Sequence, residues 1–207
     1  MDMLYENILR NIRRFVLMPP EQEEAFCLLL SIKKIKKKEF LLREGDVCTD
    51  EYFVNKGCLR EYFVDQKGTE HNLYFAIEDW WISDLYSRTQ MAPTYCNIVA
   101  LEDSELIQVN HLALEKFMEE VPALERFFRM SYQQSLVNQH LRNLQMLSMT
   151  AEERYIYFRE RYPKVANRIP QKHIATFLGL TPEFFNTVHA KVMRSNRKGY
   201  ILSNFKM

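Results

Sequence analysis

The spacing of hydrophobic and polar positions changes twice along the chain. Residues from about Leu4 to Ser31 have helical spacing, interrupted at Met18-Pro19-Pro20, where proline removes a backbone donor. From Glu39 to about Val109 the hydrophobic positions form short runs rich in aromatic and β-branched residues, which is typical of strands. After His111 the helical spacing returns. The pattern therefore predicts helices, then a β domain, then helices again.

Six strands are expected in the β region, at residues 40–42, 51–54, 58–64, 71–76, 95–101 and 106–109. Three of the five glycines of the chain, Gly45, Gly57 and Gly68, lie between these strands at nearly even intervals. Glycine tolerates positive φ, so it is the expected residue at such corners. This arrangement favours a small antiparallel barrel or jelly roll. The basic run from Lys33 to Lys38 is expected to be a solvated segment leading into the first strand.

A short helix is expected from Leu112 to Val121, and a second, much longer helix from Ala123 to about Ser148, where no glycine or proline interrupts the chain. The long helix would measure about 39 Å. Along one face of this helix, mostly apolar positions recur at alternating three- and four-residue steps, as in a coiled coil, and we call this face the seam. Such a helix either packs across its own β domain or pairs with a second copy. The candidate dimer interface consists of Phe127, Met130, Gln134, Val137, Leu141 and Leu144.

The C-terminal region carries the pattern of a helix-turn-helix. Thr150 and Glu153 fit a capping box that begins a helix ending before Pro163. A helix over residues 171–178 and another over 183–194 flank Gly179, which supplies a tight turn. An ordinary helical hairpin is the alternative. The stretch 197–202 is consistent with a short wing. The domain boundaries expected are 1–121, 122–148 and 149–207.

Charge separates the C-terminal region from the rest. The 207 residues carry a net charge of only +1, but eight basic residues and one acid give residues 164–207 a net charge of +7. A basic module on an acidic body is typical of a protein that binds a polyanion, and a solvated basic surface is the alternative. No apolar run reaches the roughly 20 residues of a membrane helix, and no secretory signal is recognised. We therefore expect a cytoplasmic protein without membrane contact.

The cysteines and histidines argue against several kinds of site. Cys27, Cys48, Cys58 and Cys96 lie 21, 10 and 38 residues apart, which fits no disulfide framework, zinc ribbon or iron–sulfur cluster. His71 is the only histidine in the predicted roll, so a metal-dependent jelly-roll enzyme is not expected. No nucleophile elbow, phosphate loop or dinucleotide fingerprint is found. The sequence predicts neither an enzyme nor a bound metal.

Three stretches in this order resemble the Crp/Fnr family of bacterial transcription regulators: 42–46 (LREGD), 52–60 (YFVNKGCLR) and 169–192. The resemblance implies an α+β fold with an N-terminal cyclic-nucleotide-binding-like β-roll (jelly roll), a long central dimerisation helix and a C-terminal winged helix-turn-helix. It also implies a homodimer whose recognition helices enter successive major grooves of double-stranded DNA, roughly 34 Å apart. RNA polymerase is a further partner implied by the resemblance.

The effector pocket implied by the resemblance departs from the family pattern. Members that bind cyclic nucleotides hold the ribose with Gly-Glu and the phosphate with Arg followed by Ser or Thr, and these positions here are Ser83-Asp84 and Thr94-Tyr95. Without that arginine the phosphate loses a bidentate, charge-assisted contact, and Arg88 is the one substitute nearby. Cyclic AMP is therefore not expected. No cofactor is predicted, and an unknown small-molecule effector or haem is left open. The candidate pocket comprises Ser83, Asp84, Leu85, Arg88, Thr94 and Tyr95.

The recognition helix also departs from the family, which often reads guanine with arginines on either side of a glutamate. Glu183 is kept, whereas Pro182 and Thr187 occupy the arginine positions. Sequence-specific DNA binding is predicted, and a sensor or protein-interaction module without such binding is the alternative. The candidate DNA contacts are Glu183, Asn186, Thr187 and His189 for bases and Gln171, Lys172, Thr181, Lys191 and Arg194 for the backbone.

Overall fold

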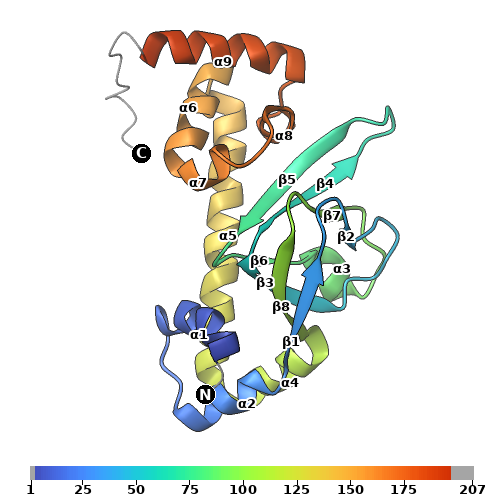
Figure 1. Cartoon of the computed structure of the whole chain (residues 1–207), viewed down its shortest axis with the longest axis vertical. Helices are drawn as coiled ribbons and strands as arrows, with labels where there is room; N and C mark the ends of the chain where they lie inside the picture. Colours follow the sequence, from blue (N-terminus) through green and yellow to red (C-terminus); the bar gives the residue numbers. More distant parts are fainter. Residues whose placement is uncertain (1–2, 197–207) are drawn as a thin grey trace. The chain divides into compact units, whose positions relative to one another are not determined.

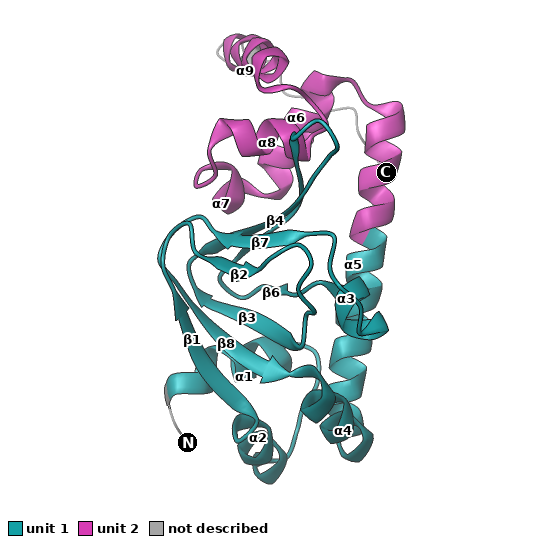
Figure 2. Cartoon of the chain, turned by 90° about the vertical axis from the view of Figure 1, so that its right-hand side faces the viewer, with its two compact units in different colours: residues 1–137 teal, residues 138–207 magenta. Residues whose placement is uncertain are grey.

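The computed structural model describes residues 3–196. The chain divides into two compact units, residues 1–137 and 138–207 (Figure 2). Within the described range, no helix has the length and apolar character needed to cross a membrane. Unit 1 contains η1 (Met3–Tyr5), α1 (Glu6–Arg13), α2 (Pro20–Cys27), β1 (Leu30–Ile35), β2 (Phe40–Leu42), β3 (Asp50–Lys56), β4 (Cys58–Val64), β5 (Glu70–Ile77), β6 (Trp81–Ile82), α3 (Leu85–Gln90), β7 (Asn97–Ala100), β8 (Ser104–Asn110) and α4 (His111–Glu120).

The strands form two four-stranded antiparallel sheets, in the orders β1-β8-β3-β6 and β2-β7-β4-β5 (Figure 1). Each sheet joins strands distant in sequence: β8 lies between β1 and β3, and β7 lies between β2 and β4. This is the jelly-roll arrangement that the evenly spaced glycine corners predict.

The first sheet is buried on both faces, and strand alternation divides its side chains between two cores. Tyr52 and Val54 of β3 point into the roll, where they pack with Leu59, Ile98 and Leu106. The intervening residue, Phe53, points outward with Ile107 into a second core formed with the helices. Residues of α1, α2, α4 and α5 (Pro122–Ser148) complete that second core: Ile8, Leu9, Phe26, Leu114, Leu124 and Phe127.

The structure differs from the expectations for unit 1 in the strand β1 and in two short elements. Leu30 and Ser31 belong to strand β1 and not to the preceding helix, and the first part of the basic run lies in that strand. In β1 the ends are buried and the lysines between them are at least partly exposed, which suits a sheet edge. The two-residue strand β6 and the six-residue helix α3 were not expected, since elements this short show no measurable periodicity.

Unit 2 contains the C-terminal part of α5, α6 (Ala151–Arg161), α7 (Pro163–Ala166), α8 (Gln171–Phe177) and α9 (Pro182–Asn196). The predicted capping box at Thr150 and Glu153 is present, with both reciprocal hydrogen bonds. Gly179 has a φ of +70° in the turn between α8 and α9, as a tight turn requires. The buried core includes Tyr155, Phe158, Ile174, Phe185, Val188 and Val192. The stretch 197–202, where a wing is expected, lies outside the described residues.

Gly57 is the corner where the absence of a side chain matters most. Its φ is +119°, and a Cβ added there would lie 2.8 Å from the Cα of Ser104 on the neighbouring strand. Both the backbone conformation and the close approach of β8 therefore require glycine.

We expect Gly57→Ala to reduce the free energy of unfolding by about 2–6 kcal/mol, because backbone strain and overpacking each cost about 1–3 kcal/mol. Gly45→Ala is the matched control, since Gly45 has a φ of +91° but an added Cβ would meet no atom within 4 Å. Urea denaturation followed by tryptophan fluorescence measures both variants. Equal losses would show that the contact with Ser104 contributes nothing.

Candidate functional site

The candidate effector pocket is organised by the N-terminus of α3. Asp84 is the N-cap of this helix and accepts a hydrogen bond from the Ser87 backbone N–H at 3.1 Å. The Thr94 hydroxyl donates to the other Asp84 carboxylate oxygen, and it accepts a hydrogen bond from the Cys96 backbone N–H at 2.9 Å. The structure thus brings Asp84 and Thr94 into direct contact. Of the other predicted pocket residues, Ser83 is half-buried, and Leu85 and Tyr95 are exposed.

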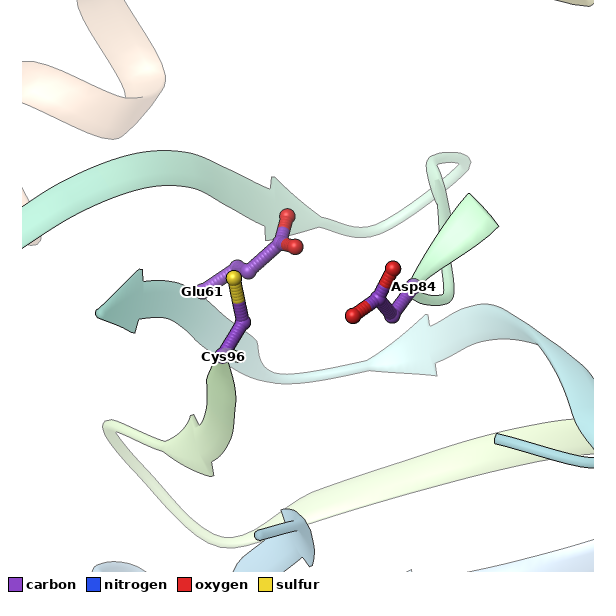
Figure 3. Close-up of side chains that lie close together, drawn as sticks. All are labelled: Glu61, Asp84 and Cys96. Atoms are coloured by element: carbon purple, nitrogen blue, oxygen red, sulfur yellow. The ribbon is translucent and has the colours of Figure 1, made fainter. Parts of the chain in front are cut away.

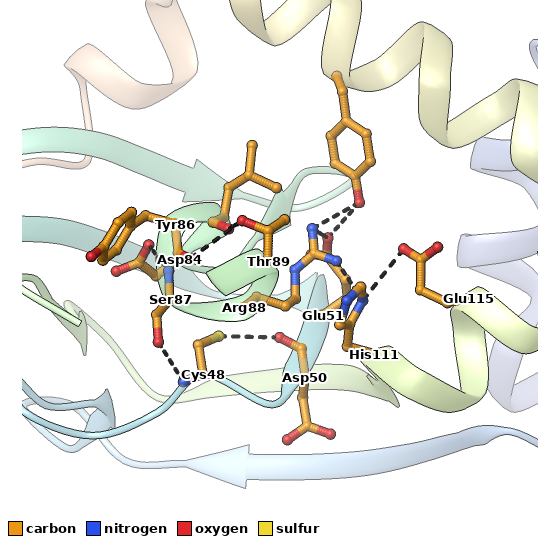
Figure 4. A network of polar contacts seen from close by, with 12 residues as sticks. Cys48, Asp50, Glu51, Asp84, Tyr86, Ser87, Arg88, Thr89, His111 and Glu115 are labelled. Carbon is orange, nitrogen blue, oxygen red and sulfur yellow. Dashed lines mark hydrogen bonds and ion pairs between the residues drawn. The ribbon is translucent and has the colours of Figure 1, made fainter. Parts of the chain in front are cut away.

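Arg88, the residue considered as a replacement for the phosphate-binding arginine, lies in a buried polar network (Figure 4). Its guanidinium Nη2 lies 2.7 Å from the Glu51 carboxylate, and the two side chains are 1% and 3% exposed. Arg88 also donates to Tyr132 Oη at 3.0 Å and to His111 Nδ1 at 2.7 Å. Tyr132 donates in turn to Glu51 at 2.8 Å. These contacts occupy Arg88 inside the protein, so it is not placed to bind a phosphate.

The network joins four elements of unit 1, because Arg88 lies on α3, Glu51 on β3, His111 at the start of α4 and Tyr132 on α5. Burial, and next the positive charge of Arg88, lower the pKa of His111. The imidazole is therefore neutral at pH 7, with Nδ1 free to accept the hydrogen bond from Arg88. Sequence reasoning did not find Glu51, His111 or Tyr132 as partners of Arg88.

Beside Asp84 lies a cluster of three ligating side chains, Glu61, Asp84 and Cys96 (Figure 3). Their carboxylate oxygens and thiol sulfur all lie within 4.8 Å of one another. Burial, and next the charge of Asp84, raise the pKa of Glu61 to about 7. Burial, with the nearby charges of Glu61, Asp84 and Glu44, raises the pKa of Cys96 to about 12. At pH 7 the Cys96 thiol is therefore neutral, and the cluster offers carboxylates where the resemblance implies a cation.

Strand alternation is the signal that could have identified Glu61. Leu59 of β4 is completely buried inside the roll, and Glu61 lies two residues further on the same strand, hence on the same face. An acidic residue at an inward position of a strand is uncommon and indicates a site. Cys96 is brought to Glu61 by the pairing of β4 with β7, in which Glu61 lies opposite Ile98.

The predicted DNA contacts lie on α8, α9 and the turn between them. On α9, Phe185, Val188 and Val192 are buried, whereas Glu183, Asn186, Thr187, Lys191 and Arg194 are exposed. Lys191 Nζ lies 2.7 Å from Glu152 of α6, and within the surface itself the Gln171 side chain lies 3.3 Å from the His189 ring. Lys172 and Thr181 are exposed, and the Thr181 hydroxyl accepts a hydrogen bond from the Phe184 backbone N–H.

Comparison with known proteins agrees with this architecture. Residues 32–121 match the cyclic nucleotide-binding domain family. FixK2 from Bradyrhizobium japonicum is similar in structure with a TM-score of 0.69 and 18% identity, over 81% of this chain and 86% of that one. A putative transcriptional regulator of the Crp/Fnr family from Eubacterium rectale gives a TM-score of 0.67 and 17% identity, over 86% and 85%.

This chain shares its fold with solved regulators of the Crp/Fnr family. The resemblance seen in the sequence is thereby confirmed. The c-di-GMP-responsive global regulator CLP from Xanthomonas campestris has the same fold. Its TM-score is 0.68 at 12% identity, over 86% of this chain and 93% of CLP. No curated protein matches the sequence.

We expect Arg88→Met to reduce the free energy of unfolding of unit 1 by about 3–5 kcal/mol, because it leaves the Glu51 carboxylate buried without its cation. The double variant Arg88→Met/Glu51→Leu should recover most of this loss, since it removes both buried charges. Urea denaturation followed by the fluorescence of Trp80 and Trp81 measures unit 1.

Arg129→Met is the control for this prediction, because Arg129 forms an exposed ion pair with Glu125 at 3.6 Å. Its effect should stay below about 0.5 kcal/mol. A loss in Arg88→Met no larger than in Arg129→Met would show that the buried network does not stabilise the roll.

Proposed function

We propose that this chain is a homodimeric, sequence-specific DNA-binding transcription regulator that does not respond to cyclic AMP. The proposal rests chiefly on one observation, the division of α9 into a buried apolar face and an exposed polar and basic face. A helix held in this way by its own domain presents side chains that fit the major groove. The net charge of +7 over residues 164–207 supplies the attraction to phosphates.

Direct reading of bases is assigned to the N-terminal half of α9. Glu183, Asn186 and Thr187 are exposed there, and His189 is half-buried one turn further on. Asn pairs in a bidentate manner with adenine, and a carboxylate accepts from cytosine. Without the arginines that read guanine, the operator is expected to depend on adenine and cytosine contacts.

Backbone contacts are assigned to Lys191 and Arg194 on α9 and to Gln171, Lys172 and Thr181 near the ends of α8. Lys191 is already paired with Glu152, whose pKa this ion pair lowers. A phosphate must therefore compete with the Glu152 carboxylate for the same ammonium group. Since both side chains reach solvent, the exchange costs little.

The dimer interface is assigned to α5. Val137 and Leu144 on the seam are 50% and 41% exposed, and Leu136 and Leu147 beside it are 68% and 87% exposed. Met130 and Leu141 are half-buried, and Gln134 is exposed. Phe127, at the start of the predicted seam, is only 1% exposed and packs in the core of unit 1. The proposed interface therefore begins at Met130, and a second copy would cover the exposed leucines.

Insensitivity to cyclic AMP is inferred from the charges of the pocket. Thr94 stands at the position of the phosphate-binding arginine, Arg88 is held by Glu51, and Glu61 adds a second acidic group beside Asp84. A buried cyclic phosphate would meet carboxylates instead of a cation. We also propose that the protein is located in the cytoplasm and contacts bacterial RNA polymerase. We propose no catalytic role for it.

The test is selection of bound sequences from a random double-stranded pool, with and without cyclic AMP. Enrichment of the same two-fold symmetric site in both cases is the expected result. Enrichment of no sequence would overturn the proposal in favour of a sensor or interaction module. Enrichment only with cyclic AMP would overturn the assignment of the pocket.

We expect Arg194→Ala and Lys191→Ala each to lower the salt dependence of DNA binding, with the slope of log K against log salt changing by about 1. Glu152→Gln should strengthen binding, because it releases Lys191 from its ion pair. Fluorescence anisotropy over a range of salt concentrations measures all three. Lys116→Ala removes the same charge from an exposed position on α4, outside the basic region 164–207, and should leave the slope unchanged; an equal change there would contradict the assignment to α9.

We expect Leu144→Glu to weaken dimerisation more than about 100-fold, because two like charges would face each other across a desolvated seam. Gln139→Glu is the control, since Gln139 is exposed and lies away from the seam on the same helix. Sedimentation velocity distinguishes monomer from dimer. If both variants dimerise equally, the seam of α5 is not the interface.

A further inference from the structure

We propose that Glu61, Asp84 and Cys96 form a binding site for a divalent transition-metal ion of the Zn²⁺ class. The inference depends on the roll alone, so it stands whether or not α9 binds DNA. From the sequence alone no metal site is predicted, because the cysteines and histidines are widely spaced.

Three separate elements supply the ligating atoms. Glu61 comes from β4, Asp84 from the N-cap of α3, and Cys96 from the residue that precedes β7. Figure 3 shows the two carboxylates and the thiol facing a common space, and their ligating atoms lie within 4.8 Å of one another. Zn–S and Zn–O bonds are about 2.3 and 2.0–2.2 Å long. A small movement of the side chains would therefore bring all three ligating atoms to these distances from one ion.

A hydrogen-bonded residue orients two of the three ligands. The Thr94 side chain, on a residue only 2% exposed, donates to the Asp84 carboxylate and accepts from the Cys96 backbone N–H. The Ser87 backbone N–H donates a hydrogen bond to the other oxygen of the Asp84 carboxylate. Outer partners of this kind fix the orientation of metal ligands and support their affinity.

The charges of the cluster also call for a cation. The Glu61 and Asp84 carboxylates lie close together, and Asp84 is buried. Like charges this close, away from water, require either a bound proton or a cation. A divalent ion would neutralise both carboxylates at once.

The donor set selects the class of ion. Magnesium and calcium prefer oxygen ligands alone, whereas a cysteine thiolate favours zinc and other borderline or soft ions. Three protein ligands leave a fourth tetrahedral position for water or a small ligand. Binding requires the Cys96 thiol to lose its proton, as in other thiolate sites.

The test is titration of the chelator-treated full chain with Co²⁺, followed by displacement with Zn²⁺. One Co²⁺ per chain, with a sulfur-to-cobalt charge-transfer band that Zn²⁺ removes, is the expected result. Cys96→Ser should abolish the band, and Cys96→Ser and Glu61→Gln should each weaken Zn²⁺ binding by more than about 100-fold, since even outer partners contribute 10–100-fold.

Cys27→Ser is the matched control, because Cys27 is a half-buried thiol of the same unit that lies outside the cluster. It should keep both the band and the affinity. Asp84→Asn is the variant expected to keep the fold, since asparagine is as good an N-cap as aspartate, and it should still lose affinity. Absence of the band in the wild type, equal loss in the Cys27 variant, or Mg²⁺ binding as tight as Zn²⁺ would each overturn the proposal.

Discussion

The ion pair between Arg88 and Glu51 is the interaction on which the arrangement of unit 1 depends. A charge pair this deeply buried gains little net stability, because desolvation offsets most of the Coulomb attraction. Its importance lies in its geometry. The guanidinium has partners on β3, α4 and α5, so α3 has only one position in which all these hydrogen bonds form.

The same pair determines what the pocket can bind. Arg88 is held by Glu51, and the side chains gathered at Asp84 are a second carboxylate, Glu61, and the Cys96 thiol. A fold that accommodates anionic nucleotides in other proteins thus has the opposite local charge here. The fold is shared with those proteins, so the difference lies in the side chains. Fold and ligand class are separable in this scaffold.

Much of this fold could be predicted from local signals. Glycine corners, aromatic runs and the uninterrupted stretch before Ser148 each act within a few residues, and they identified most of the strands and the long helix. Strand β1 was missed because Lys33 and Lys34 interrupt its apolar pattern at a sheet edge. The site was harder to predict, because its residues come from elements that are far apart in the sequence. Arg88 and Tyr132 are 44 residues apart, and only the packing of α5 against the roll brings them together.

The brevity of α3 has a mechanical consequence. The helix has six residues and is therefore about 9 Å long, too short to bend or to unwind partially without losing most of its hydrogen bonds. Asp84 caps one end, and Arg88 lies one turn further along. A single helical turn therefore separates the Asp84 carboxylate from the guanidinium that donates to Tyr132 of α5, with only helical backbone between them.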